Sequence, residues 1–275
     1  MSAMVTTRNN VKIMGHGPRT MVFAHGFGCD QSMWRFVAPA FARHYRVVLF
    51  DYAGSGGADP GAYDPRKYSR LDGYAQDVLG ICEELAPEKV IFVGHSVSAI
   101  IGLLAANQRP ELFSGLIMIG PSPCYINDPP DYFGGFERAD LLGLFEMMDR
   151  NYIGWAKFLA PVIMKNPDLP ELANELEESF CAIDPAIARR FAEATFFSDN
   201  RADLAKSKVP SLIMQCSDDA IAPPEVGEFL HRELPDSTLV VMRATGHCPH
   251  LSHPAETIEV ISGYLGIHPP CKALP

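Results

Sequence analysis

The sequence predicts an α/β fold, in which a mostly parallel central sheet is flanked by helices and carries an inserted helical lid. Short apolar runs recur along the 275 residues, and most are continuous rather than alternating, which is typical of strands covered on both faces. Between most of these runs lie segments whose apolar residues are three and four positions apart, as on one face of a helix. A third observation is that residues 121–204 contain helical patterns without intervening strands.

The apolar runs that are bounded by turn residues are predicted as strands. In chain order they are residues 22–24, 47–50, 90–93, 116–119, 212–214 and 238–242. Core helices are predicted at residues 71–85, 97–108 and 254–265. The first has its apolar residues on one face. The last carries Pro254 in its first turn, where a missing N–H removes no helical hydrogen bond.

Residues 121–204 are predicted as a lid inserted between two strands of the core. A proline-containing loop at residues 121–131 precedes the helical segments of this lid. These segments are residues 136–150, 152–164, 171–181 and 185–197. A run of helices in this position is typical of a lid over a site on the sheet. The rest of the chain divides into a core, residues 1–120 and 205–266, and a C-terminal tail, residues 267–275.

The composition argues against several classes of protein. Lys and Arg number 23 against 33 Asp and Glu, a net charge of −10, which argues against binding to nucleic acid or to an anionic membrane. The most apolar stretch, residues 90–106, is interrupted by glycine, histidine and serine, so no membrane span is expected. The first fifteen residues lack a secretory signal pattern. Seven scattered cysteines form no CxxC pair, so we expect free thiols, a cytoplasmic protein and no metal site.

The segment Gly94-His95-Ser96-Val97-Ser98 has the pattern of a nucleophile elbow. It directly follows the predicted strand 90–93 and opens the predicted helix 97–108, which is the setting that such an elbow requires. This sharp turn places the serine Oγ above the sheet, with backbone N–H groups free to face an oxyanion. The usual fifth residue is glycine, and here it is Ser98. The alternative is a serine that only caps the helix, which leaves the strand–turn–helix setting unexplained.

A serine hydroxyl becomes a good nucleophile when a base removes its proton, and the base needs an acid that orients it. In hydrolases with this elbow, the histidine comes last along the chain. Among nine histidines, motif position favours His247, which follows the last predicted strand. His250 and His253 share its loop and are the alternatives. His95 is expected to point away from the site.

The acid and the oxyanion donors are expected in two other loops. Asp218 and Asp219 follow the predicted strand 212–214, and neighbouring residues of an extended loop point to opposite sides, so only one should reach the base. The predicted strand 22–24 runs into the segment HGFG. This loop lies where the second oxyanion donor is expected, so we assign the donors to the N–H groups of Phe27 and Val97. The alternative is an ordinary glycine-rich turn.

Segments spread over nearly the whole chain carry a resemblance to a known family. They are HGFGCDQSMW, GHSVSAIIG, PSPCYINDPPDYFGGFE, NYIGWAKFLAP, FFSDNR and GHCPHLSHP. Through them the chain resembles the α/β-hydrolases, closely the RsbQ family of bacterial stress regulators, and also the plant strigolactone and karrikin receptor hydrolases. The resemblance implies a triad of Ser96, Asp219 and His247 with the oxyanion donors named above. It also implies pocket-lining positions at Phe27, Tyr125, Phe136, Trp155, Leu159, Phe196 and Ile221.

These residues favour a serine hydrolase that acts on a small hydrophobic ester or lactone through an acyl-enzyme, without metal or organic cofactor. A serine nucleophile argues against dehalogenase and epoxide-hydrolase chemistry, which need an aspartate there. The resemblance implies a regulatory role upstream of a general stress sigma factor, with a PAS-domain phosphatase as partner. The alternative is a ligand sensor with little or no turnover that signals through a protein. An interaction module with a relic triad is disfavoured, because the triad is complete and in order.

Overall fold

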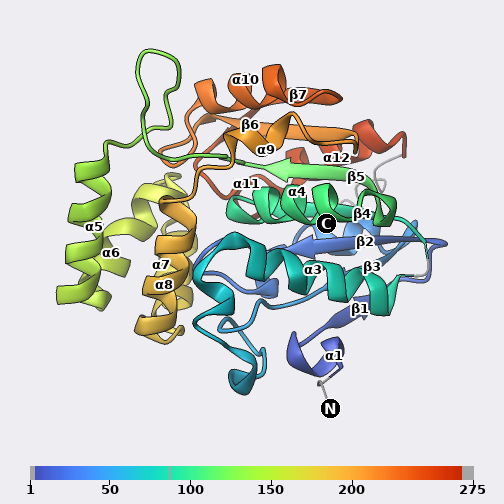
Figure 1. Cartoon of the computed structure of the whole chain (residues 1–275), viewed down its shortest axis with the longest axis horizontal. Coiled ribbons are helices and arrows are strands. Elements are labelled where there is room, and N and C mark those ends of the chain that lie inside the picture. Colours follow the sequence, from blue (N-terminus) through green and yellow to red (C-terminus); the bar gives the residue numbers. More distant parts are fainter. Residues whose placement is uncertain (1–3, 87, 268–275) are drawn as a thin grey trace.

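A seven-stranded sheet forms the centre of the computed structural model, which describes residues 4–86 and 88–267 (Figure 1). The strand order is β1-β3-β2-β4-β5-β6-β7, with β1 antiparallel to β3 and every other pair parallel. The strands are β1 (Lys12–Met14), β2 (Arg19–Ala24), β3 (Tyr45–Leu49), β4 (Val90–His95), β5 (Phe113–Ile119), β6 (Ser211–Asp218) and β7 (Ser237–Thr245). The predicted fold class is confirmed.

The sequence patterns did not predict β1, because its three residues are exposed or half-buried and form no apolar run. The other strands were predicted, since they contain continuous apolar runs; in β2, β4 and β5 these residues are buried on both faces, whereas those of the edge strand β7 are partly exposed. The structure extends most of them by one to four residues at one or both ends, where mostly polar residues continue the hydrogen-bonded ladder.

Helices cover both faces of the sheet, so each face has its own apolar core. Side chains of α3 (Leu71–Leu85), α4 (Val97–Gln108) and α10 (Pro224–Glu233) pack with Val22, Val48 and Phe92 on one face. On the other face, α2 (Ala38–Phe41) and α12 (Pro254–Leu265) pack against Phe23, Val93 and Ile117. The remaining short helices are α1 (Val5–Arg8), α9 (Arg201–Leu204) and α11 (Pro249–Ser252).

Four helices between β5 and β6 form a separate layer, at the left of Figure 1. They are α5 (Arg138–Arg150), α6 (Tyr152–Met164), α7 (Pro170–Cys181) and α8 (Pro185–Phe196). The ends of these four helices lie within two residues of the predicted ones. Helix α5 begins later than predicted because Glu137 caps it, in a reciprocal pair with Asp140. The inward side chains of these four helices form a third apolar cluster, together with residues of the loops that follow β2 and β7.

None of the helices in residues 4–86 and 88–267 is long and apolar enough to cross a membrane. The six cysteines within those residues are free, as expected. Cys271 and nearly all of the proposed tail lie outside the described residues. The division into core and lid at residues 121 and 204 stays a prediction.

Candidate active site

Ser96 lies at the sharp turn between β4 and α4, in a backbone conformation that L-residues rarely adopt. Its φ and ψ are 56° and −125°, a strained combination that tends to mark functional sites. The turn is possible because strand and helix approach closely at Gly94, where a Cβ would lie 2.6 Å from the carbonyl oxygen of Ser98. Ser96 occupies the N-cap position of α4, yet its side chain makes no capping hydrogen bond. The capping alternative therefore does not explain this residue.

A continuous chain of hydrogen bonds joins Ser96, His247 and Asp219. The Ser96 Oγ lies 2.7 Å from Nε2 of His247, and Nδ1 of His247 lies 2.7 Å from Oδ2 of Asp219. The other carboxylate oxygen of Asp219 accepts the N–H groups of Ile221 and Ala222 at 2.8 and 3.1 Å. An ionised carboxylate only accepts, so Nδ1 carries the imidazole proton and Nε2 is left to accept from Ser96.

The structure distinguishes between the alternatives that the sequence left open. Asp218 points away from His247 and pairs with Lys165 at the surface. The ring of His250 packs at a tilt against that of Trp34, with 4.6 Å between ring centroids, and burial lowers its pKa to about 3. His253 contacts the Ser252 hydroxyl at the start of α12. None of these three side chains is hydrogen-bonded to Ser96 in the described structure.

The expectation that His95 points away from the site is wrong. Its ring packs against that of His247 with centroids 5.0 Å apart, and its Nε2 lies 2.8 Å from the carbonyl oxygen of His247. Because a carbonyl only accepts, Nε2 carries the proton and donates it. Burial holds the pKa of His95 well below its usual value, so the ring is neutral. His95 thus supports the backbone of His247 and lines the cavity beside Ser96.

The loop after β2 passes directly beside Ser96. A Cβ on Gly26 would lie 3.4 Å from the Cβ of Ser96. The backbone N–H groups of Phe27 and Val97 have no hydrogen-bond acceptor within the described residues, so both are available to an oxyanion. The usual elbow has glycine at position 98, and here the serine side chain fills this place. Its hydroxyl is hydrogen-bonded to the carbonyl of His25 and to the Tyr52 hydroxyl. It ties this loop to α4, a role that the motif alone did not indicate.

Ser96 and His247 border a small apolar cavity of about 20 Å³. A second cavity of about 20 Å³ adjoins it and shares Phe196 and Ile221 as walls. Of the pocket positions implied by the resemblance, these six line the two cavities: Phe27, Phe136, Trp155, Leu159, Phe196 and Ile221. Tyr125 lies behind them, with its ring 4.9 Å from that of Phe196. No sequence signal indicated Cys29, Ile163, Leu176, Phe180, Thr195 or Cys248, which also line the first cavity.

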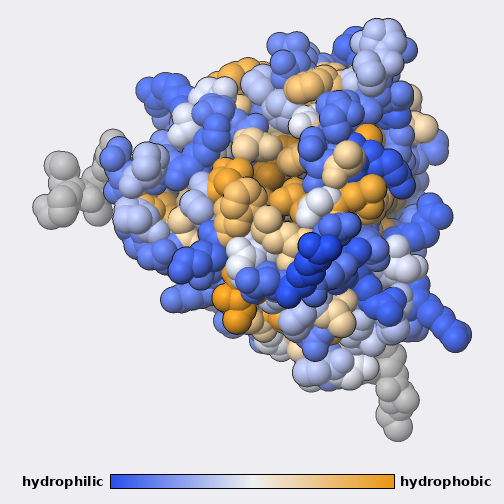
Figure 2. Space-filling view, turned by 90° about the vertical axis from the view of Figure 1, so that its left-hand side faces the viewer, coloured by the Kyte–Doolittle hydropathy of each residue, from blue (hydrophilic) through white to orange (hydrophobic). Residues whose placement is uncertain are grey.

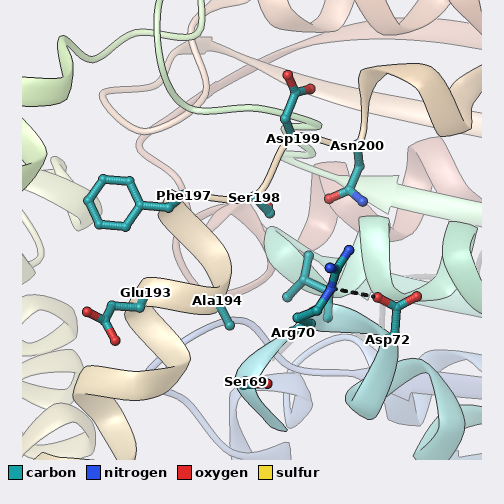
Figure 3. A pocket seen from close by; sticks show the side chains of 10 residues that line it. Ser69, Arg70, Asp72, Glu193, Ala194, Phe197, Ser198, Asp199 and Asn200 are labelled. Atoms are coloured by element: carbon teal, nitrogen blue, oxygen red, sulfur yellow. Dashed lines mark ion pairs between the residues drawn. The ribbon is translucent and has the colours of Figure 1, made fainter. Parts of the chain in front are cut away.

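Seen from the lid, apolar side chains gather around a hollow in the middle of this face (Figure 2). A larger cleft, of about 400 Å³, lies at the surface between the start of α3 and the end of α8 (Figure 3). Its charged side chains are paired with neighbours, as in Arg70–Asp72 at 3.4 Å and Asp199–Arg201 at 2.7 Å. The cleft contains no nucleophile with a base among the described residues, so we place the candidate active site at Ser96.

Comparisons with known proteins identify related sequences and structures. Residues 21–260 match the model of a family described as the alpha/beta hydrolase family. The chain is 42% identical over 260 residues to the karrikin insensitive 2 receptor CA of Petunia hybrida, covering 94% of this chain and 96% of that protein. It is 39% identical over 253 residues to the strigolactone esterase D14 of Arabidopsis thaliana, covering 92% and 94%. A solved hydrolase from Oleispira antarctica superposes with a TM-score of 0.93 at 45% identity, covering 96% and 97%.

Proposed function

The chain belongs to the alpha/beta hydrolase family, and from that premise we propose that it is a serine hydrolase with Ser96, His247 and Asp219 as its triad. The hydrogen-bonded chain of these three side chains, with two distances of 2.7 Å, is the observation that carries the proposal. The substrate class is inferred from the walls of the cavities: those of the second cavity are all aromatic or aliphatic, and half of the residues around the first are. Such walls favour a small hydrophobic ester or lactone.

The reaction proceeds through an acyl-enzyme. Ser96 attacks the carbonyl carbon while its proton moves to Nε2 of His247, and Asp219 stabilises the imidazolium that forms. The N–H groups of Phe27 and Val97 donate to the developing oxyanion, where loss of one donor typically lowers the rate by about 10²–10³. The tetrahedral intermediate then collapses, and the leaving alkoxide takes the proton from Nε2. A water molecule then attacks the acyl-enzyme with His247 as the base, and the carboxylic acid leaves from Ser96.

Entry of a substrate needs movement of side chains. Two cavities of about 20 Å³ each hold little more than one water molecule. Phe196 and Ile221, which separate them, must move for an acyl or lactone ring to reach Ser96. This requirement favours slow exchange of ligand and product, and it is the reason to keep a sensor with little turnover as the second candidate. The relative described as a karrikin insensitive 2 receptor is in accord with it.

We further propose a regulatory role like that of the RsbQ family, in which the protein acts upstream of a general stress sigma factor and contacts a PAS-domain phosphatase. The support is the resemblance of the lid segments together with apolar side chains exposed on α5 and α6, namely Leu142, Ile153 and Phe158. Isothermal titration of the purified protein with such a phosphatase tests this role. Leu142→Asp and Phe158→Asp should weaken binding, and absence of binding to the wild-type protein would refute it.

Hydrolysis of p-nitrophenyl acetate at high enzyme concentration tests the chemistry. We expect nitrophenolate release from the wild-type protein and its loss in Ser96→Ala and His247→Ala. Sustained turnover supports the hydrolase, whereas a burst equal to the enzyme concentration followed by near-arrest supports the sensor. If both variants release nitrophenolate as fast as the wild type, the proposed triad is wrong.

A further inference from the structure

Two adjacent residues at the end of the lid helix α6 have backbone conformations that L-residues rarely adopt. Lys165 has φ and ψ of 51° and −129°, close to the 56° and −125° of Ser96, and Asn166 has a φ of 41°. Among the non-glycine residues that the structure describes, only Asn10 shares a positive φ with these three. Such conformations are costly and persist where the surroundings enforce them, often at functional sites. The contacts made by this end of α6 show what enforces them here.

The side chain of Asn166 joins the end of α6 to the segment that carries His247. Its Nδ2 donates to the carbonyl of Met164 at 2.7 Å and to the carbonyl of Thr245 at 2.9 Å. Its Oδ1 accepts the hydroxyl of Thr245 at 3.4 Å. Both donor hydrogens and the acceptor of this amide are therefore used. One side chain of the lid thus binds the residue two positions before the base.

The next two residues of this segment are held at the same place. The N–H of Gly246 donates to the carbonyl of Asp218 at 2.8 Å, and the N–H of His247 donates to the carbonyl of Ile163 at 2.8 Å. A Cβ on Gly246 would lie 3.1 Å from Nδ2 of Asn166, so the amide is packed closely against the loop. The backbone of the base is therefore fixed where α6, the end of β6 and the loop after β7 meet.

We propose that Asn166 is a positioning residue for His247, so that the lid takes part in catalysis as well as enclosing the substrate. This proposal rests on the proposed function. Proton transfer needs both hydrogen bonds of the imidazole, to Ser96 and to Asp219, which are 2.7 Å long. Asn166 lines neither cavity beside the triad and acts only through the backbone from which the imidazole projects. Without its amide, residues 245–247 move more freely, and fewer molecules have both bonds in place.

Two substitutions remove the bridge in different ways. Asn166→Gly deletes the side chain and keeps the backbone conformation, because glycine adopts a positive φ freely. Asn166→Asp keeps the shape of the side chain but turns a carboxylate oxygen, which cannot donate, toward two carbonyls. Asn10→Gly is the matched control, since Asn10 has a φ of 45° and its amide donates to Asp51 at 2.7 Å rather than to a triad loop. Urea midpoints show whether each variant is folded, and either Asn166 variant serves for the test.

We expect Asn166→Gly to lower kcat/KM for p-nitrophenyl acetate by about 10- to 100-fold, the scale of a small misplacement of a catalytic group. The loss should fall on kcat, with KM nearly unchanged, because Asn166 does not line the cavities. Asn166→Asp should lose at least as much, and Asn10→Gly should keep a nearly normal rate.

The deciding measurement repeats the Asn166 change in the His247→Ala background, at high enzyme concentration. Loss of one triad member leaves slow residual catalysis. A residue that acts through the base has nothing to position there, so the residual rate should fall no further.

A fall by the same factor in the His247→Ala background would mean general loosening of the site and would overturn the role of Asn166. An unchanged kcat/KM in folded Asn166→Gly, or an equal loss in Asn10→Gly, would overturn it as well. Failure of the proposed function is a separate result, because hydrolysis would then persist undiminished in Ser96→Ala.

Discussion

Replacement of Asp219 by asparagine is the most direct test of how the triad is oriented. In the wild-type protein the carboxylate accepts three hydrogen bonds, from Nδ1 of His247 and from the N–H groups of Ile221 and Ala222. In Asp219→Asn the amide oxygen can keep the two backbone N–H groups, because both lie on the same carboxylate oxygen. The amide nitrogen then faces Nδ1 of His247 and donates to it.

The magnitude follows from the change of tautomer. When Nδ1 must accept a hydrogen bond, the proton moves to Nε2, which then faces Ser96 as a donor and cannot take its proton. In another serine hydrolase triad this substitution lowers kcat by about 10⁴, which corresponds to about 5 kcal/mol of activation free energy. Because the backbone bonds persist, the free energy of unfolding should change by only about 1 kcal/mol.

Asp218→Asn is the matched control in the same loop. Asp218 is exposed and pairs with Lys165, and such surface ion pairs contribute about 0–1 kcal/mol. The assay is the initial rate of p-nitrophenyl acetate hydrolysis, with the urea midpoint as a measure of folding. We expect a loss of about 10⁴ in Asp219→Asn and a nearly unchanged rate in Asp218→Asn. Equal losses in the two variants, or a larger loss in Asp218→Asn, would refute the assignment of Asp219 as the residue that orients His247.

Two further predictions concern stability. Gly94→Ala should lower Tm by several degrees, because the new Cβ would lie 2.6 Å from Ser98, whereas Gly143→Ala on α5, where nothing lies within 4 Å, should raise Tm slightly. A normal Tm in Gly94→Ala would contradict the close approach. Stability should also fall as pH drops below about 6.5, because His95 and His250 stay neutral when folded and bind protons when unfolded. Urea midpoints measured from pH 7 to 4 would show this fall, and a flat profile would contradict it.

Most of the fold was predictable because burial on both faces produces apolar runs that the sequence displays directly. Strand β1 was not, since its pairing with β3 depends on a neighbour remote in sequence rather than on its own three residues. Helix α10 was also missed, although Pro224 at its start and the buried pair Val226 and Leu230 are ordinary helix signals. The lid helices were predicted closely, because turn and capping residues mark most of their ends.

The candidate site divides into parts that a motif contains and parts that only folding brings together. The elbow motif indicated Ser96, and chain order indicated His247. The choice between Asp218 and Asp219 depends on which way each side chain turns at the end of β6, which spacing alone does not determine. The contact of His95 with His247 could not be predicted from spacing either, because β4 and the loop after β7 are far apart in sequence and meet only in the folded chain.

The backbone of His247 is held from two directions, and this connects the lid to the chemistry. Its carbonyl accepts from His95, while its N–H donates to the carbonyl of Ile163 on α6 at 2.8 Å. A Cβ on Gly246 would lie 2.2 Å from the carbonyl oxygen of Met164, so α6 is pressed against this loop. Movement of α6 away from the core would therefore release the base from its position. A lid movement that admits a ligand and preserves catalysis must keep α6 in place and displace α5 or α8, which carry Phe145 and Phe196 over the cavities.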